Sequence, residues 1–239
     1  MFVFDTTYLL FILPCVIISL ICQVRVKTAF SKYGQIPNAR GMTGAQAAEY
    51  VLRHNGVTGV RIEHVAGNLT DHYDPRTNVI RLSDAVYNVS SVAAIGVAAH
   101  EAGHAVQTAM NYLPNKLRSA ILPAARFGSA FSWILIAAGF LFAYRVPNSF
   151  GQYLLYGGII LFAASVLFTV ITLPVEFDAS RRALKCIRET KLLPDEQYKG
   201  CKSVLTAAAM TYVASALTAI MQLLRLLLQL PKHPGRSHR

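Results

Sequence analysis

The most informative segment of this 239-residue chain is AAHEAGHAVQTAM, residues 98–110. Two histidines and a glutamate stand within about one helical turn in a run that is otherwise small and apolar. On an α-helix, His100 and His104 project from one face, so both imidazoles can reach a single ion. Glu101 is rotated by about 100° from His100 and lies beside that ion. The segment therefore predicts a helix that carries a metal site.

The pattern is HExxH, the motif of zincin metalloproteases. Two neutral imidazoles and one carboxylate give Zn²⁺ three protein ligands and leave a position open for water, whose pKa the metal lowers to about 7. Glu101 can then accept the proton of that water during attack on a peptide carbonyl. The alternative is that His100 and His104 are hydrogen-bonded core histidines. Ionisable groups in so apolar a helix are usually functional, so we favour the zinc site.

The third ligand must come from elsewhere in the chain. Glu176 begins EFDASRRAL directly after an apolar segment, on the side of the membrane where we expect HExxH to lie. The alternative role of Glu176 is to cap the N-terminus of a following helix, where a carboxylate is favourable. His72, in TDHYDPR, is a second candidate ligand. We expect Glu176 to complete the site with the two motif histidines.

Composition places the chain among membrane proteins, because 54% of its residues are hydrophobic. Four apolar segments are expected to span the membrane, whose hydrocarbon core is about 30 Å thick. They cover residues 7–24, 130–144, 153–175 and 204–224. The first lacks the basic flank and the cleavage site of a signal peptide, so we expect a retained anchor.

Basic residues set the orientation of these spans. Lys and Arg follow the first span and are frequent in residues 176–203, whereas the loop RVPNSFGQ between spans two and three has Arg145 alone. We therefore expect 25–129 and 176–203 on the cytoplasmic side, with spans two and three forming a tight hairpin. The basic tail does not fit this orientation, because a fourth span would place it on the outer side, where basic residues are less common. Either the tail is an exception or the last apolar segment is re-entrant or interfacial.

The expected fold class is mainly α, an integral membrane helical bundle of about four spans with a small α+β zincin-like lobe. The net charge of +11 is explained by this topology and by attraction to anionic lipids, so no nucleic-acid binding is expected. The predicted divisions are an N-terminal transmembrane anchor (1–24), a cytosolic-side lobe with the HExxH helix (25–129), a transmembrane hairpin (130–175), a cytosolic helical segment with the third ligand (176–203), a C-terminal apolar helix (204–230) and a basic tail (231–239).

Local signals predict the elements of the lobe. Thr43 and Gln46 have the spacing of a helix-capping box. Alternating apolar and polar residues predict strands, and the metal helix is expected to end before Pro114. The strand NVIRLS is either internal to a small sheet or available to pair with an extended substrate. The predicted elements are a short helix after residue 43, strands at 59–65 and 78–83 with the turn-rich DHYDPRT near them, the metal helix from about Ser90 or Ser91, and a helix at 115–128.

Three motifs resemble the YugP-like family of bacterial membrane-bound neutral zinc metallopeptidases: AAHEAGHAVQ, the upstream DHYDPRTNVIRLS and the downstream LPVEFDASRRAL. The likeness runs from the first span to TYVASALTAIMQLL near the end. It implies an integral-membrane zinc endopeptidase in which His100, His104 and Glu176 match the metal positions. Glu101 matches the catalytic position.

The chain is more distantly similar to the HtpX and CaaX-type membrane proteases, whose second motif has Asp four residues after the Glu. Here that position is Ser180, and Asp178 stands two residues earlier. The resemblance therefore leaves open which group orients the histidine ligands. Arg181 and Arg182 could stabilise an oxyanion, although a role in membrane topology is favoured.

The expected function is a zinc-dependent endopeptidase of the bacterial cell membrane that cleaves membrane-associated proteins on the cytoplasmic side. Its expected partners are the lipid bilayer and a protein or peptide substrate, and the sequence predicts no oligomeric state. One alternative is an intramembrane site-2-type protease, although the LDG motif of that class is absent from the sequence. The other is a scaffold whose zinc site is closed by a fourth ligand such as His72.

Overall fold

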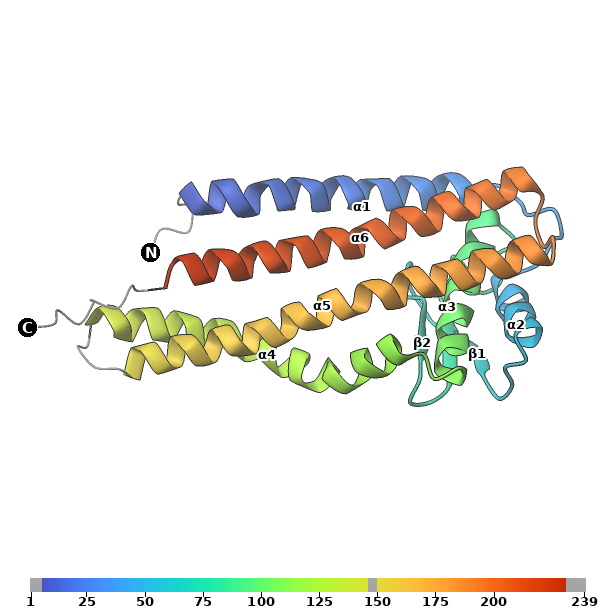
Figure 1. Cartoon of the computed structure of the whole chain (residues 1–239). Helices are drawn as coiled ribbons and strands as arrows, with labels where there is room; N and C mark the ends of the chain where they lie inside the picture. Colours follow the sequence, from blue (N-terminus) through green and yellow to red (C-terminus); the bar gives the residue numbers. More distant parts are fainter. Residues whose placement is uncertain (1–5, 146–149, 231–239) are drawn as a thin grey trace, which may run out of the picture. The chain divides into compact units, whose positions relative to one another are not determined.

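Long helices dominate the computed structural model, which describes residues 6–145 and 150–230 (Figure 1). This confirms the expected mainly α fold class with a small sheet. The helices are α1 (Leu13–Gly34), preceded by a π-helical turn (Tyr8–Ile12), α2 (Gly44–His54), α3 (Val92–Ala109), α4 (Leu113–Arg145), α5 (Phe150–Glu189) and α6 (Asp195–Leu228). The strands are β1 (Arg61–His64), β2 (His72–Asp74) and β3 (Val79–Leu82).

Four of the described helical segments are long and apolar enough to cross a membrane, as predicted: Tyr8–Gly34, Leu113–Phe142, Phe150–Glu189 and Asp195–Leu228. The helices run beyond the predicted spans. The helix predicted at 115–128 and the second span form the single helix α4, and α5 continues past its apolar part. Residues 146–149 of the predicted hairpin loop and the basic tail lie outside the described residues.

Glu176 lies well inside α5, so its alternative role as a helix cap is wrong. Pro174 stands two residues earlier and does not end the helix. Proline is tolerated in membrane-spanning helices where neighbouring groups satisfy the freed carbonyl. The side chain of Glu176 is therefore presented from the side of a continuous helix.

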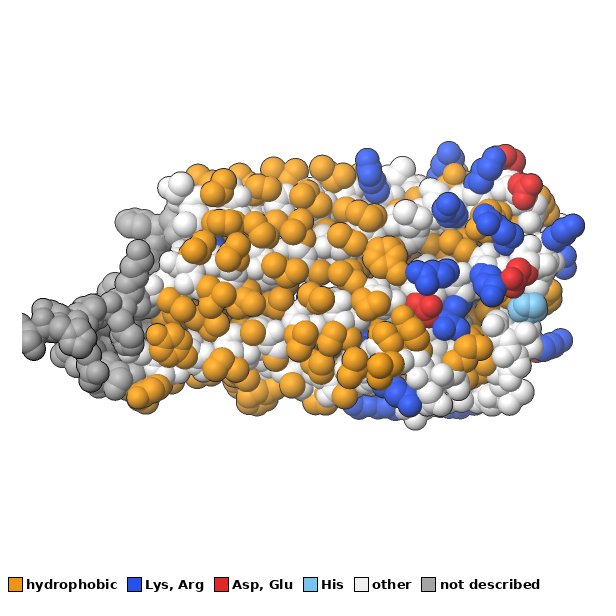
Figure 2. All heavy atoms as spheres, viewed as in Figure 1, with side chains coloured by type: hydrophobic (Ala, Val, Ile, Leu, Met, Phe, Trp, Pro, Cys, Tyr) orange, Lys and Arg blue, Asp and Glu red, His pale blue; other side chains and the backbone are white. Residues whose placement is uncertain are grey.

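The described residues divide into two compact units, and the first contains those that fall within 1–18, 121–169 and 215–239. In this unit α4 and α5 approach closely at Gly139, where an added Cβ would lie 2.6 Å from the backbone nitrogen of Leu155. Such small residues allow membrane helices to pack backbone to backbone. The exposed side chains of its helices are largely hydrophobic (Figure 2), which suits a surface covered by lipid.

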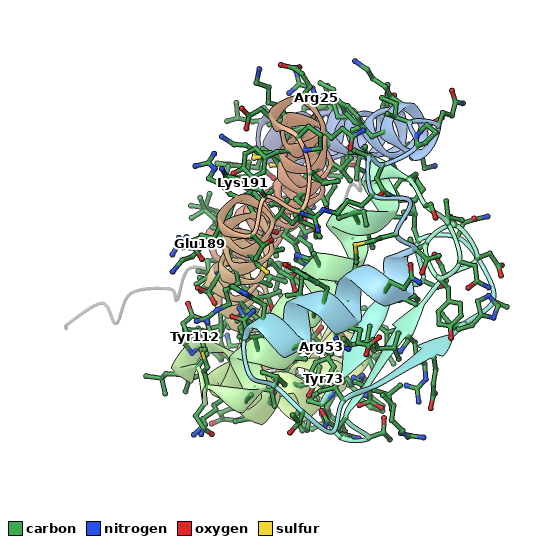
Figure 3. All side chains as sticks on the ribbon, turned by 90° about the vertical axis from the view of Figure 1, so that its right-hand side faces the viewer. Arg25, Arg53, Tyr73, Tyr112, Glu189 and Lys191 are labelled. Carbon is green, nitrogen blue, oxygen red and sulfur yellow. The ribbon has the colours of Figure 1, made fainter. Side chains whose placement is uncertain are left out.

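The second unit contains residues 19–120 and 170–214. Its core is formed mainly by α2, α3 and β3 together with residues of α5 and α6. The predicted capping box of α2 is confirmed, because the Thr43 hydroxyl accepts from Gln46 N at 3.3 Å and Thr43 N donates to the Gln46 side chain at 2.9 Å. Arg53 on α2 has a side chain that is 77% exposed, and Tyr73 lies on β2 (Figure 3).

The sheet has the strand order β1-β3-β2, with β3 parallel to β1 and antiparallel to β2. The sequence predicted two strands, whereas part of the turn-rich DHYDPRT forms β2. A tight turn follows β2, in which the Asp74 carboxylate accepts hydrogen bonds from Arg76 N at 3.0 Å and the Thr77 hydroxyl at 2.7 Å. Since both edges of β3 are paired, the proposal that NVIRLS adds a substrate strand is wrong.

Helix α3 crosses the core of the second unit and packs against α5. Its Ser91 N-cap accepts a hydrogen bond from Ala94 N at 3.1 Å, as the sequence predicted for the start of the metal helix. At Gly103, an added Cβ would lie 2.6 Å from the carbonyl oxygen of Ala179. The glycine inside HEAGH therefore allows the backbone of α5 to approach α3, which brings the side chains of the two helices together.

Candidate metal centre

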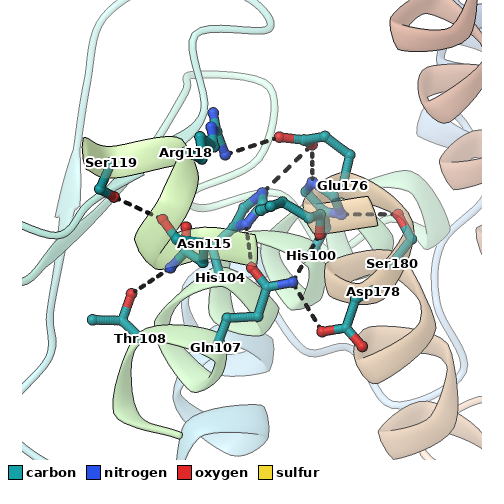
Figure 4. A network of polar contacts seen from close by, with 11 residues as sticks. His100, His104, Gln107, Thr108, Asn115, Arg118, Ser119, Glu176, Asp178 and Ser180 are labelled. Carbon is teal, nitrogen blue, oxygen red and sulfur yellow. Dashed lines mark hydrogen bonds and ion pairs between the residues drawn. The ribbon is translucent and has the colours of Figure 1, made fainter. Parts of the chain in front are cut away.

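Three potential metal ligands from α3 and α5 converge in the second unit (Figure 4). The Nε2 atoms of His100 and His104 lie 3.3 and 3.5 Å from Oε2 of Glu176. One ligand atom from each residue lies within 4.8 Å of the other two. Ligands at about 2 Å from a common Zn²⁺ ion would have separations of this order.

The outer nitrogen of each imidazole has its own polar partner. Nδ1 of His104 lies 3.1 Å from Oε1 of Gln107, and Nδ1 of His100 lies 3.0 Å from the hydroxyl of Ser180. An amide oxygen only accepts hydrogen bonds, so Nδ1 of His104 carries the proton and donates it to Gln107. In the neutral ring the lone pair is then on Nε2, which faces Glu176.

The buried side chain of Gln107 has a defined orientation. Its Nε2 donates to the carbonyl oxygen of Val175 at 2.8 Å and to Oδ2 of Asp178 at 2.9 Å. The same oxygen of Asp178 accepts from Nε of Arg182 at 2.6 Å. Asp178 therefore acts on His104 through Gln107, and Ser180 contacts His100 directly. These contacts identify the groups that orient the two histidines.

Glu176 is 2% exposed, and its Oε2 has no hydrogen-bond donor in the described structure. Its other oxygen, Oε1, accepts from a guanidinium nitrogen of Arg118 at 3.2 Å. A buried carboxylate oxygen that faces an imidazole lone pair is unfavourable without a cation between them. Two imidazole nitrogens and one carboxylate oxygen are also a common ligand set for catalytic zinc. The arrangement therefore fits a zinc ion.

The electrostatics of the site favour a positive charge. Burial lowers the pKa of His104, but a protonated ring could donate to Glu176 and is attracted by the charges of Glu101 and Glu176, so the pKa is raised above its ordinary value. Only a neutral imidazole can bind a metal ion. Metal binding therefore competes with protonation of His104 and weakens as the pH falls through this raised pKa.

A cavity of about 140 Å³ lies beside the potential ligands and is lined by His100, Glu101 and Glu176. Glu101 is 8% exposed, so its carboxylate faces this cavity rather than bulk water. The other walls are largely apolar and include Val26, Phe30, Val97, Leu205 and Ala208. A cavity with a few converging polar groups and apolar walls is typical of a ligand-binding site.

Other residues considered from the sequence lie elsewhere. His72 is exposed on β2, where its Nδ1 lies 2.8 Å from the carbonyl oxygen of Thr70, and it is not in the described group of potential ligands. Arg181 and Arg182 do not line the cavity, and Arg182 is paired with Asp178. Neither arginine is therefore placed to stabilise an oxyanion in this cavity.

The sequence analysis did not identify Gln107, Arg118 or Tyr212 as residues of the site. Of these three, Tyr212 lines the cavity. Gln107 follows His104 by three residues on the same face of α3, so helical spacing could have indicated the contact. No comparable local signal marks Arg118 on α4 or Tyr212 on α6. Both come close to the site through the packing of separate helices.

Replacing Gln107 with Ala is expected to weaken zinc binding by about 10- to 100-fold, because His104 loses the acceptor that holds its ring. Competition with a calibrated zinc chelator measures the affinity. Asn115→Ala is the matched control, because Asn115 is hydrogen-bonded to Thr108 in the same region and contacts neither histidine. An unchanged affinity in folded Gln107→Ala protein would contradict this role.

Comparisons with known proteins agree with the geometry. A family model described as "Putative neutral zinc metallopeptidase" matches residues 8–230. The chain is also 44% identical over 204 residues to a protein of Bacillus subtilis (strain 168) named "Putative membrane protease YugP", with coverage of 85% of this chain and 87% of that protein. No solved structure matches the chain.

Proposed function

Because the chain belongs to the family described as "Putative neutral zinc metallopeptidase", we propose that it is a membrane-anchored zinc-dependent endopeptidase. The observation that carries this proposal is the convergence of His100, His104 and Glu176 around one point, with no hydrogen-bond donor for Oε2 of Glu176. A purely structural role would not need a buried carboxylate oxygen and two partly buried imidazole nitrogens to face one another. In this proposal the three residues hold the zinc ion.

The ion, when bound, supplies a Lewis acid that lowers the pKa of a water molecule and polarises a peptide carbonyl. Glu101 is the general base, because its carboxylate lines the same cavity as the proposed ligands His100 and Glu176. It accepts a proton from water and delivers it to the leaving amine. Gln107 and Ser180 hold the imidazoles in place, so that both Nε2 atoms face the ion.

The alternative of a closed structural zinc site requires a fourth protein ligand. Among the described residues, the group of potential ligands contains three, and Glu101 and Tyr212 line the cavity next to it. This arrangement supports an open coordination position. It therefore favours catalysis over a scaffold function.

The substrate is proposed to be a membrane-associated protein or peptide. The apolar walls of the cavity come from α1, α3 and α6, so an apolar side chain next to the cleaved bond would be buried there. Helices α1 and α6 are also candidate membrane spans. The same two helices therefore connect the membrane-spanning region to the cavity, which suits a substrate segment at the membrane surface.

The protein is proposed to lie in the bacterial cell membrane with its site on the cytoplasmic side. The support is the number of Lys and Arg residues in 25–40 and 176–203. In spheroplasts, an impermeant amine reagent should leave exposed Lys27 and Lys185 unmodified until the membrane is opened. Labelling of both in intact spheroplasts would place the site on the outer side.

The function is tested with the purified full-length protein in mild detergent. We expect one zinc ion per chain and cleavage of an unfolded apolar protein such as casein. Removal of zinc with a chelator should abolish cleavage, and added zinc should restore it. Cleavage that persists in metal-free protein, or X-ray absorption showing four protein ligands and no exchangeable water, would contradict the proposal.

A further inference from the structure

Helices α1 and α6 border a second depression in the second unit, separate from the metal cavity. This groove has a volume of about 680 Å³ and is lined by α1 residues between Cys22 and Tyr33 and by α6 residues between Lys199 and Met210. The metal cavity uses other positions of the same helices, including Val26 and Leu205. The function proposed above gives the groove no role.

The groove has a strongly positive lining. None of the residues that line it is acidic. Four of them are basic, namely Arg25, Lys32, Lys199 and Lys202. Only Lys199 has an ion-pair partner among the described residues, namely Glu196 at 2.7 Å. Figure 3 shows Arg25 near α6. The remaining cations can therefore contact an anion that enters the groove.

Polarity changes along the length of the groove. The end of α1 lies against the start of α6, because a Cβ added to Gly200 would lie 2.7 Å from the ring of Tyr33. Lys32 and Lys202 therefore line one end. Val24, Ala207 and Met210 line the other end, where Arg25 is the remaining basic residue and where α1 and α6 continue as candidate membrane spans.

We propose that this groove binds one anionic phospholipid. Its phosphate contacts the lysines at the polar end, and the first part of an acyl chain lies along Val24, Ala207 and Met210 at the apolar end. The nine residues from Val24 to Lys32 span about 12 Å of helix, which accommodates a head group and the start of a chain. Basic depressions between membrane helices suit anionic head groups, since charge-assisted hydrogen bonds strengthen as water is excluded.

The test uses the full-length protein in uncharged detergent and native mass spectrometry. Dioctanoyl-phosphatidylglycerol should bind saturably with one high-affinity molecule per chain, and dioctanoyl-phosphatidylcholine at least about tenfold more weakly. Equimolar inorganic phosphate should not displace the lipid, because it lacks the acyl chain. The double variant Lys32→Gln/Lys202→Gln should bind the anionic lipid about 10- to 30-fold more weakly.

The matched control is Lys27→Gln/Lys185→Gln. It removes the same charge from two exposed lysines that do not line the groove, so binding should stay within about twofold of the unmodified protein. A further variant, Ala207→Trp, retains every charge and fills the apolar end. It should also weaken lipid binding by at least about tenfold, and zinc content and melting temperature show that each variant is folded.

Four results would overturn the proposal. If the control variant lost as much lipid affinity as the groove variant, the lipid would be bound by general attraction to a basic surface. Equal binding of the two lipids would exclude recognition of the anionic head group. Displacement by equimolar phosphate, or undiminished binding in folded Ala207→Trp protein, would exclude an acyl chain in the groove. If the double lysine variant does not fold, the single Lys202→Gln variant and Ala207→Trp carry the test.

Discussion

Glu101→Gln protein should bind zinc normally and cleave peptide bonds about 10²- to 10⁴-fold more slowly than the unmodified enzyme. Glutamine has nearly the same size as glutamate, so the buried site keeps its shape. Its amide cannot accept a proton from water, and it therefore cannot act as the general base. Zinc content by mass spectrometry and turnover of a fluorogenic peptide measure the two effects separately.

The control for this change is Glu49→Gln. Glu49 is exposed on α2, where it pairs with Arg53 at 2.6 Å, so its loss should leave turnover within about twofold. Full turnover by Glu101→Gln protein would exclude Glu101 as the base. Loss of zinc from this variant would instead indicate that Glu101 is a ligand.

Glu176→Gln protein should lose both zinc and activity. The substitution replaces a charged oxygen ligand with a neutral amide, which is a weak ligand for zinc. Changes to groups that only orient ligands cost about 10- to 100-fold in affinity, so we expect a loss of more than about 100-fold here. Competition with a zinc chelator measures the affinity, and turnover at saturating zinc shows whether activity follows occupancy.

Glu189→Gln is the matched control, because Glu189 is on the same helix and its side chain is 53% exposed beside Lys185. It should retain zinc affinity and turnover. Tight zinc binding by Glu176→Gln protein would remove Glu176 from the ligand set. The two variants of the site therefore differ in kind: Glu101→Gln separates binding from cleavage, whereas Glu176→Gln loses both together.

Local patterns in the sequence predicted most of the elements. The four-residue spacing of His100 and His104 is a property of a single helix, and the cap at Ser91 and the capping box at Thr43 involve neighbouring residues. Apolar runs predicted the four candidate spans for the same reason. The short strand β2 was missed because its three residues pair with β3, and no pattern within DHYDPRT indicates that pairing.

The position of Glu176 beside the two motif histidines was predicted only through topology, and the other groups around the site were not predicted. Arg118 reaches Glu176 from α4, and Asp178 reaches His104 through Gln107. The Arg118–Glu176 and Gln107–Asp178 contacts join residues that are 58 and 71 positions apart, so helix spacing carries no information about them.

The sequence by itself determined which residue types could bind and use a zinc ion, because HExxH places its three side chains through the geometry of one helix. Tertiary structure decided which carboxylate faces them and which groups hold the imidazoles. The physical reason is the close approach of α3 and α5 at Gly103 and Ala179, which depends on the packing of whole helices. That packing turns a local motif into a site where two imidazole nitrogens and a buried carboxylate oxygen lie close together.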